Sequence, residues 1–339
     1  MMSLHRYTML LFSLLLTACL QGCDKDDAPV AAPQDRSGIG YVMEDNFNYS
    51  VTKLVLDYTG QSDRLKSDTV FTFLAPDNAA WFRQGILPRP IVTESNEWYL
   101  NMARNLILPG SHSLRAMPLG DNQPLTNAAG FKIYVSRYKT GNDTITRVNG
   151  AKVSLTDLKA GNGLIQSMED VPMAETKPTL ADMLLNDTAY TLFTQALQRC
   201  GLLESLKTGE HTVLAPHNAV LRAAGTIQPG INLSTAADIL ASDPQALAAL
   251  MKYHILPGRQ FLDAIHRSAA ASGDASIITE NGARITIAGN IDGYNSISFR
   301  GVQNASAAVI YTVRGLVINF ANLPSGNGVL HCINQVLIP

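Results

Sequence analysis

The sequence is short of charge, of cysteine and of long apolar runs, and each shortage excludes a class of protein. Charged residues make up 16% of the 339 residues and hydrophobic residues 46%. Soluble domains usually carry about a quarter of charged residues, so this composition buries a core and is not that of a disordered chain. The formal net charge of −2 gives no basic field for nucleic acid. Four cysteines exclude a disulfide scaffold. No apolar run reaches the roughly 18 residues of a membrane-spanning helix.

Familiar catalytic motifs are missing as well. The sequence contains no GxSxG elbow, no HExxH, no P-loop and no dinucleotide fingerprint. The acidic stretch 24–27 lacks the twelve-residue pattern of a calcium loop. We therefore predict a protein that is not an enzyme and that uses no cofactor and no metal. Two carboxylates brought together by folding would give an envelope hydrolase, which is the minor alternative.

The first residues are typical of a bacterial lipoprotein signal peptide. Arg6 precedes an apolar run from Tyr7 to Ala18, which suits a signal-peptide core and is too short to span a bilayer. The run ends in small residues and cysteines, and this resembles the lipobox, where a cysteine thiol is lipidated. We predict a signal peptide over 1–22 and lipidation at Cys23, with Cys19 as the alternative.

An acidic tag and a tether follow the predicted lipid anchor. The residues 24–27 (DKDD) resemble the surface-export tag of lipoproteins from the Bacteroidota group. An Asp directly after the cysteine also resembles an inner-membrane retention signal of enteric bacteria. The segment 23–39 is rich in Pro, Ala and charge, which is typical of a tether. We expect an envelope protein, lipid-anchored and exposed at the surface of the outer membrane.

The rest of the chain contains an internal repeat, so the two domains that its length predicts are copies of one another. Residues 72–80 and 212–220 share six of nine letters at an offset of 140. An Ile-Leu-Pro-Gly block recurs at 107–110 and 255–258, and a Gly-Asn-Gly block at 161–163 and 326–328. The three blocks keep their order, which indicates a duplicated domain. We predict one domain over 40–173 and a second over 177–339.

Each repeated block predicts local structure. The β-branched and aromatic letters of 71–74 and 212–214 predict strands, stopped by Ala-Pro. Asp77 or Asn78, and Asn218 in the second copy, suit the N-cap of the next helix. Phe73, Leu74, Trp81 and Phe82 are expected in the core. Asn-Gly pairs predict hairpins at 147–153 and 279–285, and Thr179 with Asp182 forms a capping box. Helices and hairpins mix without βαβ alternation, so the fold class is α+β.

The motif order resembles the fasciclin-like domain family. The second copy carries TVLAPHN at 212–218, Tyr253-His254 before Pro257-Gly258, and a Gly-Asn-Gly turn leading into the final strand. The first copy departs from this pattern, with Asn105-Leu106 in place of the tyrosine–histidine pair and Gln166 in place of His331. The resemblance implies two tandem domains, each a β-wedge or sandwich with packed helices. It also implies a role in adhesion, in which Tyr253 and His254 are the adhesion-motif positions.

Histidines and cysteines allow a functional and a structural interpretation. His254 and His331 could form a contact or metal pair, but zinc needs three or four ligands. The favoured interpretation is that each is buried and bonded to the backbone. His331, like Asn78 and Asn218, is therefore predicted to be structural. His211 and His217 are expected at the surface. Cys200 and Cys332 could form a disulfide or could be small buried residues.

One region has the composition of a ligand loop. Asp292, Tyr294, Asn295 and Asn304 supply hydrogen-bonding groups and one aromatic face, as sugars or peptides require. An ordinary long hairpin loop is the equal alternative. The function predicted from all these features is adhesion or binding without catalysis, with a protein or glycan ligand and a membrane lipid anchor. The alternative is a glycan- or peptide-capture lipoprotein of a nutrient-uptake complex.

Overall fold

The computed structural model describes residues 35–339 except 84–95, 292–296, 304–306, 314–315 and 320. Residues 37–339 form one compact unit by their internal contacts. Helices and strands mix in both copies, which confirms the α+β class. No helix among the described residues has the length and apolar character to cross a membrane.

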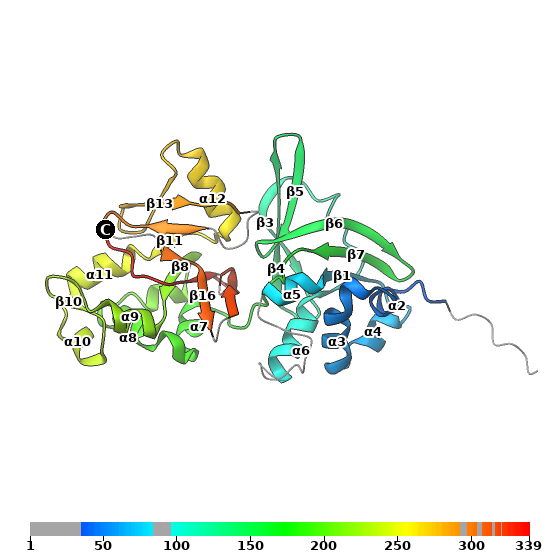
Figure 1. Ribbon diagram of the computed structural model, residues 1–339, viewed down its shortest axis with the longest axis horizontal. Coiled ribbons are helices and arrows are strands. Elements are labelled where there is room, and N and C mark those ends of the chain that lie inside the picture. The colour runs from blue at the N-terminus through cyan, green and yellow to red at the C-terminus, as the bar shows by residue number, and fades with distance from the viewer. Residues whose placement is uncertain (1–34, 84–95, 292–296, 304–306, 314–315, 320) are drawn as a thin grey trace, which may run out of the picture. The chain divides into compact units, whose positions relative to one another are not determined.

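Domain 1 combines a seven-stranded sheet with short helices (Figure 1). The sheet order is β2-β1-β7-β6-β5-β4-β3. Its helices are α2 (Ile39–Asp45), η1 (Phe47–Tyr49), α3 (Ser50–Tyr58), α4 (Ser62–Lys66), α5 (Asn78–Arg83) and α6 (Asn96–Asn105). Its strands are β1 (Phe71–Pro76), β2 (Ile107–Pro109), β3 (Gly120–Thr126), β4 (Lys132–Thr140), β5 (Asp143–Val148), β6 (Ala151–Ala160) and β7 (Gly163–Met168).

Domain 2 divides its strands among several sheets. The main sheet has the order β11-β8-β19-β18, and a second has the order β12-β13-β14-β15. Its helices are α7 (Leu180–Asn186), η2 (Thr188–Tyr190), α8 (Thr191–Arg199), η3 (Glu204–Lys207), α9 (Asn218–Ala224), α10 (Ala236–Ala241), α11 (Pro244–Lys252) and α12 (Leu262–Ala271). Its strands are β8 (His211–Pro216), β9 (Thr226–Gln228), β10 (Ile231–Asn232), β11 (Ile255–Pro257), β12 (Ser276–Ile278), β13 (Arg284–Ala288), β14 (Ser298–Arg300), β15 (Ala307–Ala308), β16 (Ile310–Val313), β17 (Leu316–Asn319), β18 (Leu323–Ser325) and β19 (Gly328–Ile333).

The same strand pairing recurs in both domains. Strand β1 pairs parallel with β7, and Phe71 lies opposite Gly163. Strand β8 pairs parallel with β19 in the same register, with His211 opposite Gly328. Strands β1 and β8 also pair antiparallel with the Ile-Leu-Pro strands β2 and β11, respectively. The repeated sequence blocks therefore form the same three adjacent strands in each domain, with the Ile-Leu-Pro strand at the edge of the sheet.

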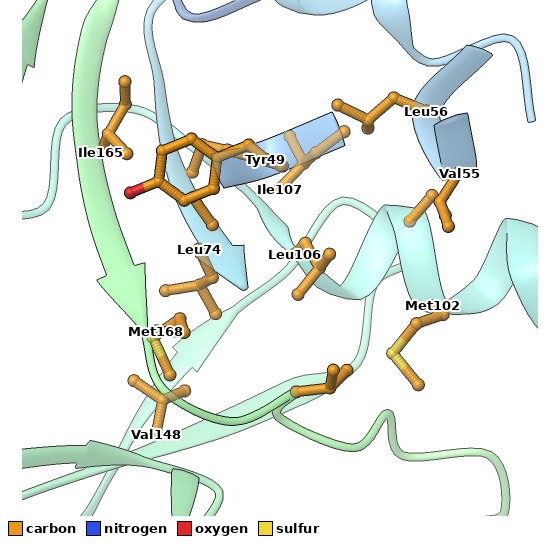
Figure 2. Packing of buried hydrophobic residues seen from close by; sticks show 14 of the residues in the cluster. Tyr49, Val55, Leu56, Leu74, Met102, Leu106, Ile107, Val148, Ile165 and Met168 are labelled. Carbon is orange, nitrogen blue, oxygen red and sulfur yellow. The ribbon is translucent and has the colours of Figure 1, made fainter. Parts of the chain in front are cut away.

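The core of domain 1 lies between its helices and the centre of its sheet. Figure 2 shows Val55 of α3 and Met102 of α6 in the same apolar cluster as Leu74 of β1 and Ile165 of β7. Trp81 is fully buried, as predicted, but Phe82 is 44% exposed, so its expected place in the core is wrong. Successive residues of the short helix α5 point in different directions, and only one face of a helix can meet the core.

The turns follow the predictions with two differences. Asn149 and Gly150 both have positive φ, at 47° and 78°, which is the backbone of a two-residue hairpin turn. The second Asn-Gly pair lies instead in a longer loop, closed by the bond from Thr279 N–H to the Ala283 carbonyl. The apolar residues from Val329 to Ile338 predict one long final strand, but β19 ends at Ile333.

Candidate functional site

The tyrosine–histidine pair of domain 2 lies where helix α11 meets strand β11. The helix begins because the Asp243 carboxylate accepts the N–H groups of its first turn and Pro244 occupies the first helical position. Tyr253 is the C-cap of this helix. The carbonyl of His254 accepts the N–H of Leu214 in β8 at 2.8 Å, so the pair joins the helix to the sheet.

Both side chains of this pair are fully buried. The Tyr253 hydroxyl donates to the carbonyl of Arg284 at 2.6 Å. The two rings meet edge to face, with centroids 6.5 Å apart. Side chains inside the core are not accessible to a partner molecule, so burial constrains how these two adhesion-motif positions could act. Their contribution to binding can only be indirect, through the fold.

His254 is held as a neutral ring of defined tautomer. Its Nε2 accepts the N–H of Leu337 at 3.0 Å, so Nδ1 carries the proton and donates to the Leu250 carbonyl at 2.9 Å. The Phe193 ring lies edge to face against it, with centroids 5.9 Å apart. Burial lowers the pKa of His254 to about 4. Both ring nitrogens are occupied by hydrogen bonds to the backbone and the ring is neutral, so it has no free nitrogen to bind a metal or transfer a proton at neutral pH.

Domain 1 tests this interpretation because its residues at the same place are Asn105 and Leu106. The carbonyl of Leu106 accepts the N–H of Leu74 at 2.8 Å, as His254 does for Leu214 in domain 2. Leu106 is also fully buried. An apolar side chain can therefore replace the histidine, which indicates that the position belongs to the core.

His331 has a similar arrangement in strand β19. Its Nδ1 accepts the N–H of Asn322 at 3.0 Å, and its Nε2 therefore carries the proton that is donated to the Gln260 carbonyl at 2.9 Å. The ring is fully buried, and burial lowers its pKa to about 4. The structure thus shows two buried, backbone-bonded histidines, which is the interpretation that the sequence favours.

Gln166 makes the equivalent bonds in domain 1. Its Oε1 accepts the N–H of Asp157 at 2.9 Å, and its Nε2 donates to the His112 carbonyl at 3.4 Å. Asp157 and His112 occupy the repeat positions of Asn322 and Gln260. The Nε2 of Gln166 also donates to Oδ1 of Asp157 at 2.8 Å. A carboxamide and a neutral imidazole can each accept one hydrogen bond and donate another, so different residues make equivalent bonds to the backbone in the two domains.

The side chains of Asn78 and Asn218 each hydrogen-bond to the start of another helix in their own domain. In domain 1, Oδ1 of Asn78 accepts the N–H of Val51 at 3.0 Å, and its Nδ2 donates to the carbonyl of Phe47 at 2.8 Å. In domain 2, Asn218 makes the same two bonds, at 2.9 and 2.8 Å, to the start of α8 and to η2. Both asparagines therefore hold a 3-10 turn and the helix after it against the strand–helix junction.

Of the two residues predicted as possible N-caps of α5, Asp77 is confirmed and Asn78 is not, and the predicted N-cap role of Asn218 in α9 is wrong. The Asp77 carboxylate accepts the Ala80 N–H of the first turn of α5 at 2.7 Å. In α9 the Nδ1 of His217 accepts the N–H of Ala219 at 3.0 Å. Asn218 begins α9 and points to another helix, a long-range contact that local sequence patterns do not reveal.

Histidine and cysteine positions in domain 2 complete the list of candidates. Cys200 and Cys332 are free thiols that pack in one apolar cluster, so the disulfide alternative is wrong. Burial raises the pKa of the Cys200 thiol. His211 is partly buried rather than at the open surface, and it pairs with Glu280 at 2.6 Å. Sequence reasoning missed that pair because 69 residues separate its members.

Several predicted positions lie outside the described residues. These are the lipidation candidates Cys19 and Cys23 and the ligand-loop residues Asp292, Tyr294, Asn295 and Asn304. Within the described part of the chain, no three His, Cys, Asp or Glu side chains lie close enough to hold a metal ion.

Two curated proteins are similar to this chain in sequence. Human periostin is 25% identical over 293 residues, which cover 86% of this chain and 31% of periostin. The transforming growth factor-beta-induced protein ig-h3 of Sus scrofa is 26% identical over 293 residues, which cover 83% of this chain and 37% of that protein. The chain therefore spans about a third of the length of the curated relatives it matches.

A solved structure and a domain family match nearly the same region. The structure is a FAS1 domain pair from the insect cell adhesion molecule fasciclin I, with a TM-score of 0.39 and 15% identity. The match covers 87% of this chain and 98% of that one. The fasciclin domain family matches twice, at residues 47–173 and 188–339, which together are most of the chain. The protein belongs to the fasciclin domain family and carries two such domains in tandem.

Proposed function

We propose that this protein acts without catalysis, in adhesion or binding at a bacterial cell surface. The observation that carries the proposal is the tandem pair of fasciclin domains, because the family implies adhesion. The burial of Tyr253 and His254 adds a constraint. A ligand must contact other, exposed residues, and the tyrosine–histidine pair supports them only through the fold.

Anchoring by lipid is part of the same proposal. The support is the sequence 16–23 (LTACLQGC), in which small residues precede each candidate cysteine. A triacylated cysteine inserts more than one chain, which gives a stable anchor. We expect palmitate to label the protein and globomycin to block its processing. The Cys23→Ala variant should lose the label and Cys19→Ala should keep it. Unlabelled protein would reject the lipoprotein assignment.

The binding function is tested on intact cells that display the protein. Retention of these cells on immobilised matrix proteins, lost when the gene is deleted, is the expected result. Saturable binding to one polysaccharide on a glycan array, without retention on matrix proteins, would favour the capture alternative. A matched control is the Tyr253→Phe variant. It removes only a buried hydroxyl, so it should change stability without changing retention per folded molecule.

A further inference from the structure

Polar and aromatic side chains connect the two domains, which both lie in the compact unit 37–339. Domain 1 contributes residues of its neighbouring strands β3, β4 and β5. Domain 2 contributes Arg259, Asp263 and Arg267, which are spaced four residues apart in helix α12 and the segment directly before it. We call the contacts of these three residues with domain 1 the α12 junction.

Two arginines of domain 2 stack on two tyrosines of domain 1. The guanidinium carbon of Arg259 lies 3.9 Å from the centroid of the Tyr134 ring. That of Arg267 lies 4.0 Å from the centroid of the Tyr138 ring. The two tyrosines are four residues apart on β4, so their side chains lie on the same face of the sheet. A guanidinium over the electron-rich face of a ring is a favourable contact, so domain 2 is attracted to one defined face of β4.

Arg259 connects a turn of domain 2 to domain 1. Its guanidinium donates, at 2.9 Å in each case, to three carbonyl groups at the turn between β18 and β19, those of Ser325, Gly326 and Gly328. Its main-chain carbonyl accepts Nδ2 of Asn122 in β3 at 2.8 Å. Domain 1 has Ser111 at the equivalent position, by the repeat offset of 148, so the domain fold does not require an arginine there. The contact with domain 1 explains its presence.

Two acidic and two basic side chains form a charged network at the same junction. Nη2 of Arg267 lies 2.6 Å from Oδ1 of Asp121 in β3 and 3.7 Å from Oδ2 of Asp263. Asp263 also interacts electrostatically with Arg147 of β5. Asp263 is 1% exposed and Arg147 is 2% exposed. Buried charges are tolerated only when they are paired, so the network needs side chains from both domains.

The α12 junction is less well satisfied than the core of either domain. Three of its buried polar atoms have no hydrogen-bond partner among the described residues, namely Oδ1 of Asn122, Oδ2 of Asp263 and Nε of Arg267. Its apolar part is a small cluster of Tyr134, Phe261 and Val329, which is separate from the larger cores. Water would satisfy the unpaired atoms when the domains separate. Polar contacts between domains allow relative motion, whereas large apolar ones do not.

We propose that the α12 junction is a latch, which holds domain 2 on domain 1 and opens reversibly. When the latch is closed, Tyr134, Arg147 and Asp263 are buried. When it is open, tyrosine and arginine side chains become exposed, and these residue types dominate protein-binding surfaces. Opening therefore changes the surface that the protein offers to a partner. The latch concerns the motion of the two domains and does not depend on the proposed adhesion.

The test is cleavage between the two domains by endoproteinase Glu-C, which cuts after glutamate. Glu175 lies in the connecting segment, is 7% exposed and interacts electrostatically with Arg259. The chain is produced from Asp24, without the predicted signal peptide and lipid but with every described residue. Cleavage after Glu175, followed by mass spectrometry, reports the fraction of open molecules. For the wild type it should be measurable but at least 100-fold slower than for the isolated peptide 171–181 (roughly the protection that paired buried charges give).

Two variants should open the latch from opposite sides. Arg267→Ala removes the ion pair with Asp121 and the stack on Tyr138, and it leaves Asp263 buried with one fewer partner. Cleavage after Glu175 should become about 100-fold faster. Asp121→Arg places two arginines opposite each other and should make cleavage about tenfold faster. Asp121 is 43% exposed on β3, so this variant still tests the latch if Arg267→Ala does not fold.

A matched control separates opening of the latch from loss of structure. Arg222→Ala removes an exposed arginine of α9 and should be cleaved at the wild-type rate. Tryptophan fluorescence checks that domain 1 is folded in each variant. Hydrogen exchange of β8 and β19 checks the same for domain 2.

Three results would overturn the proposal. A wild type cleaved as fast as the isolated peptide would show that the latch does not close. A wild type that is never cleaved would show that it does not open. Folded Arg267→Ala and Asp121→Arg variants that are cleaved at the wild-type rate would show that these contacts do not hold the domains. Cells that fail to adhere, although the variants open as expected, reject only the proposed function.

Discussion

Replacing His331 with glutamine should remove one source of acid sensitivity from domain 2. The ring of His331 is fully buried and burial lowers its pKa from 6.5 to about 4. Between these two pH values the unfolded chain binds a proton that the folded chain does not. The free energy of unfolding therefore falls as the pH decreases from about 6.5 toward 4. From pH 7 to pH 4.5 the loss is about 2.5 kcal/mol for this histidine.

The His331→Gln variant is expected to keep its hydrogen bonds. Gln166 makes the same two bonds at the equivalent position of domain 1. Stability at pH 7 should therefore change by less than about 1 kcal/mol. At pH 4.5 the variant should be more stable than the wild type by about 2.5 kcal/mol. The remaining sensitivity comes from His254, whose pKa is lowered equally and for the same reason, and from groups common to both proteins.

The assay must separate the two domains, because a two-domain chain need not unfold in one step. Both tryptophans, Trp81 and Trp98, lie in domain 1. Their fluorescence in urea should respond to pH equally in wild type and variant. Hydrogen exchange of peptides from β18 and β19, in urea at pH 7, 5.5 and 4.5, measures domain 2. The His266→Gln variant changes a half-buried histidine of the same domain and serves as the control.

Two outcomes would refute this reasoning. If His331→Gln and the wild type lost equal stability between pH 7 and pH 4.5, the ring would not be held neutral by burial. If the variant were strongly destabilised at pH 7, the glutamine would not replace both bonds of the imidazole. The first outcome rejects the electrostatic argument and the second rejects the equivalence of the two domains.

Three other substitutions test the structural roles assigned above. Asn218→Ala leaves the Leu192 N–H without its acceptor. Urea denaturation should show that domain 2 loses about 2 kcal/mol of stability. A loss of less than about 0.5 kcal/mol would indicate that Asn218 acts only locally in α9. Thr179→Ala removes the N-cap of α7 and should lower stability by about 1 kcal/mol, with Thr179→Ser close to wild type. Gly163→Ala introduces a Cβ that collides with the Phe71 carbonyl at a positive φ, so domain 1 should fail to fold, as read from tryptophan fluorescence.

For the site residues, sequence patterns predicted the burial of the histidines but not their long-range hydrogen-bond partners. The pattern predicted that His254 and His331 are buried and bonded to the backbone, because no further ligands had metal spacing. It could not name the partners, since Leu337 lies 83 residues from His254 and Gln260 lies 71 residues from His331. It also placed Asn218 at a helix cap, the commonest local role of asparagine, when the bond that matters is to a helix 26 residues away.

The duplication, the α+β class and the repeated strands of each domain could be predicted from the amino-acid sequence alone. Those features follow from local patterns and from the comparison of one copy with the other, which needs no coordinates. Local patterns could not predict that the tyrosine–histidine pair lies inside the core while Phe47 and Phe82 are exposed. Burial is decided by which elements pack together. An aromatic residue can therefore lie in the core, as Phe73 does, or at the surface, as Phe82 does, depending on which elements pack against it.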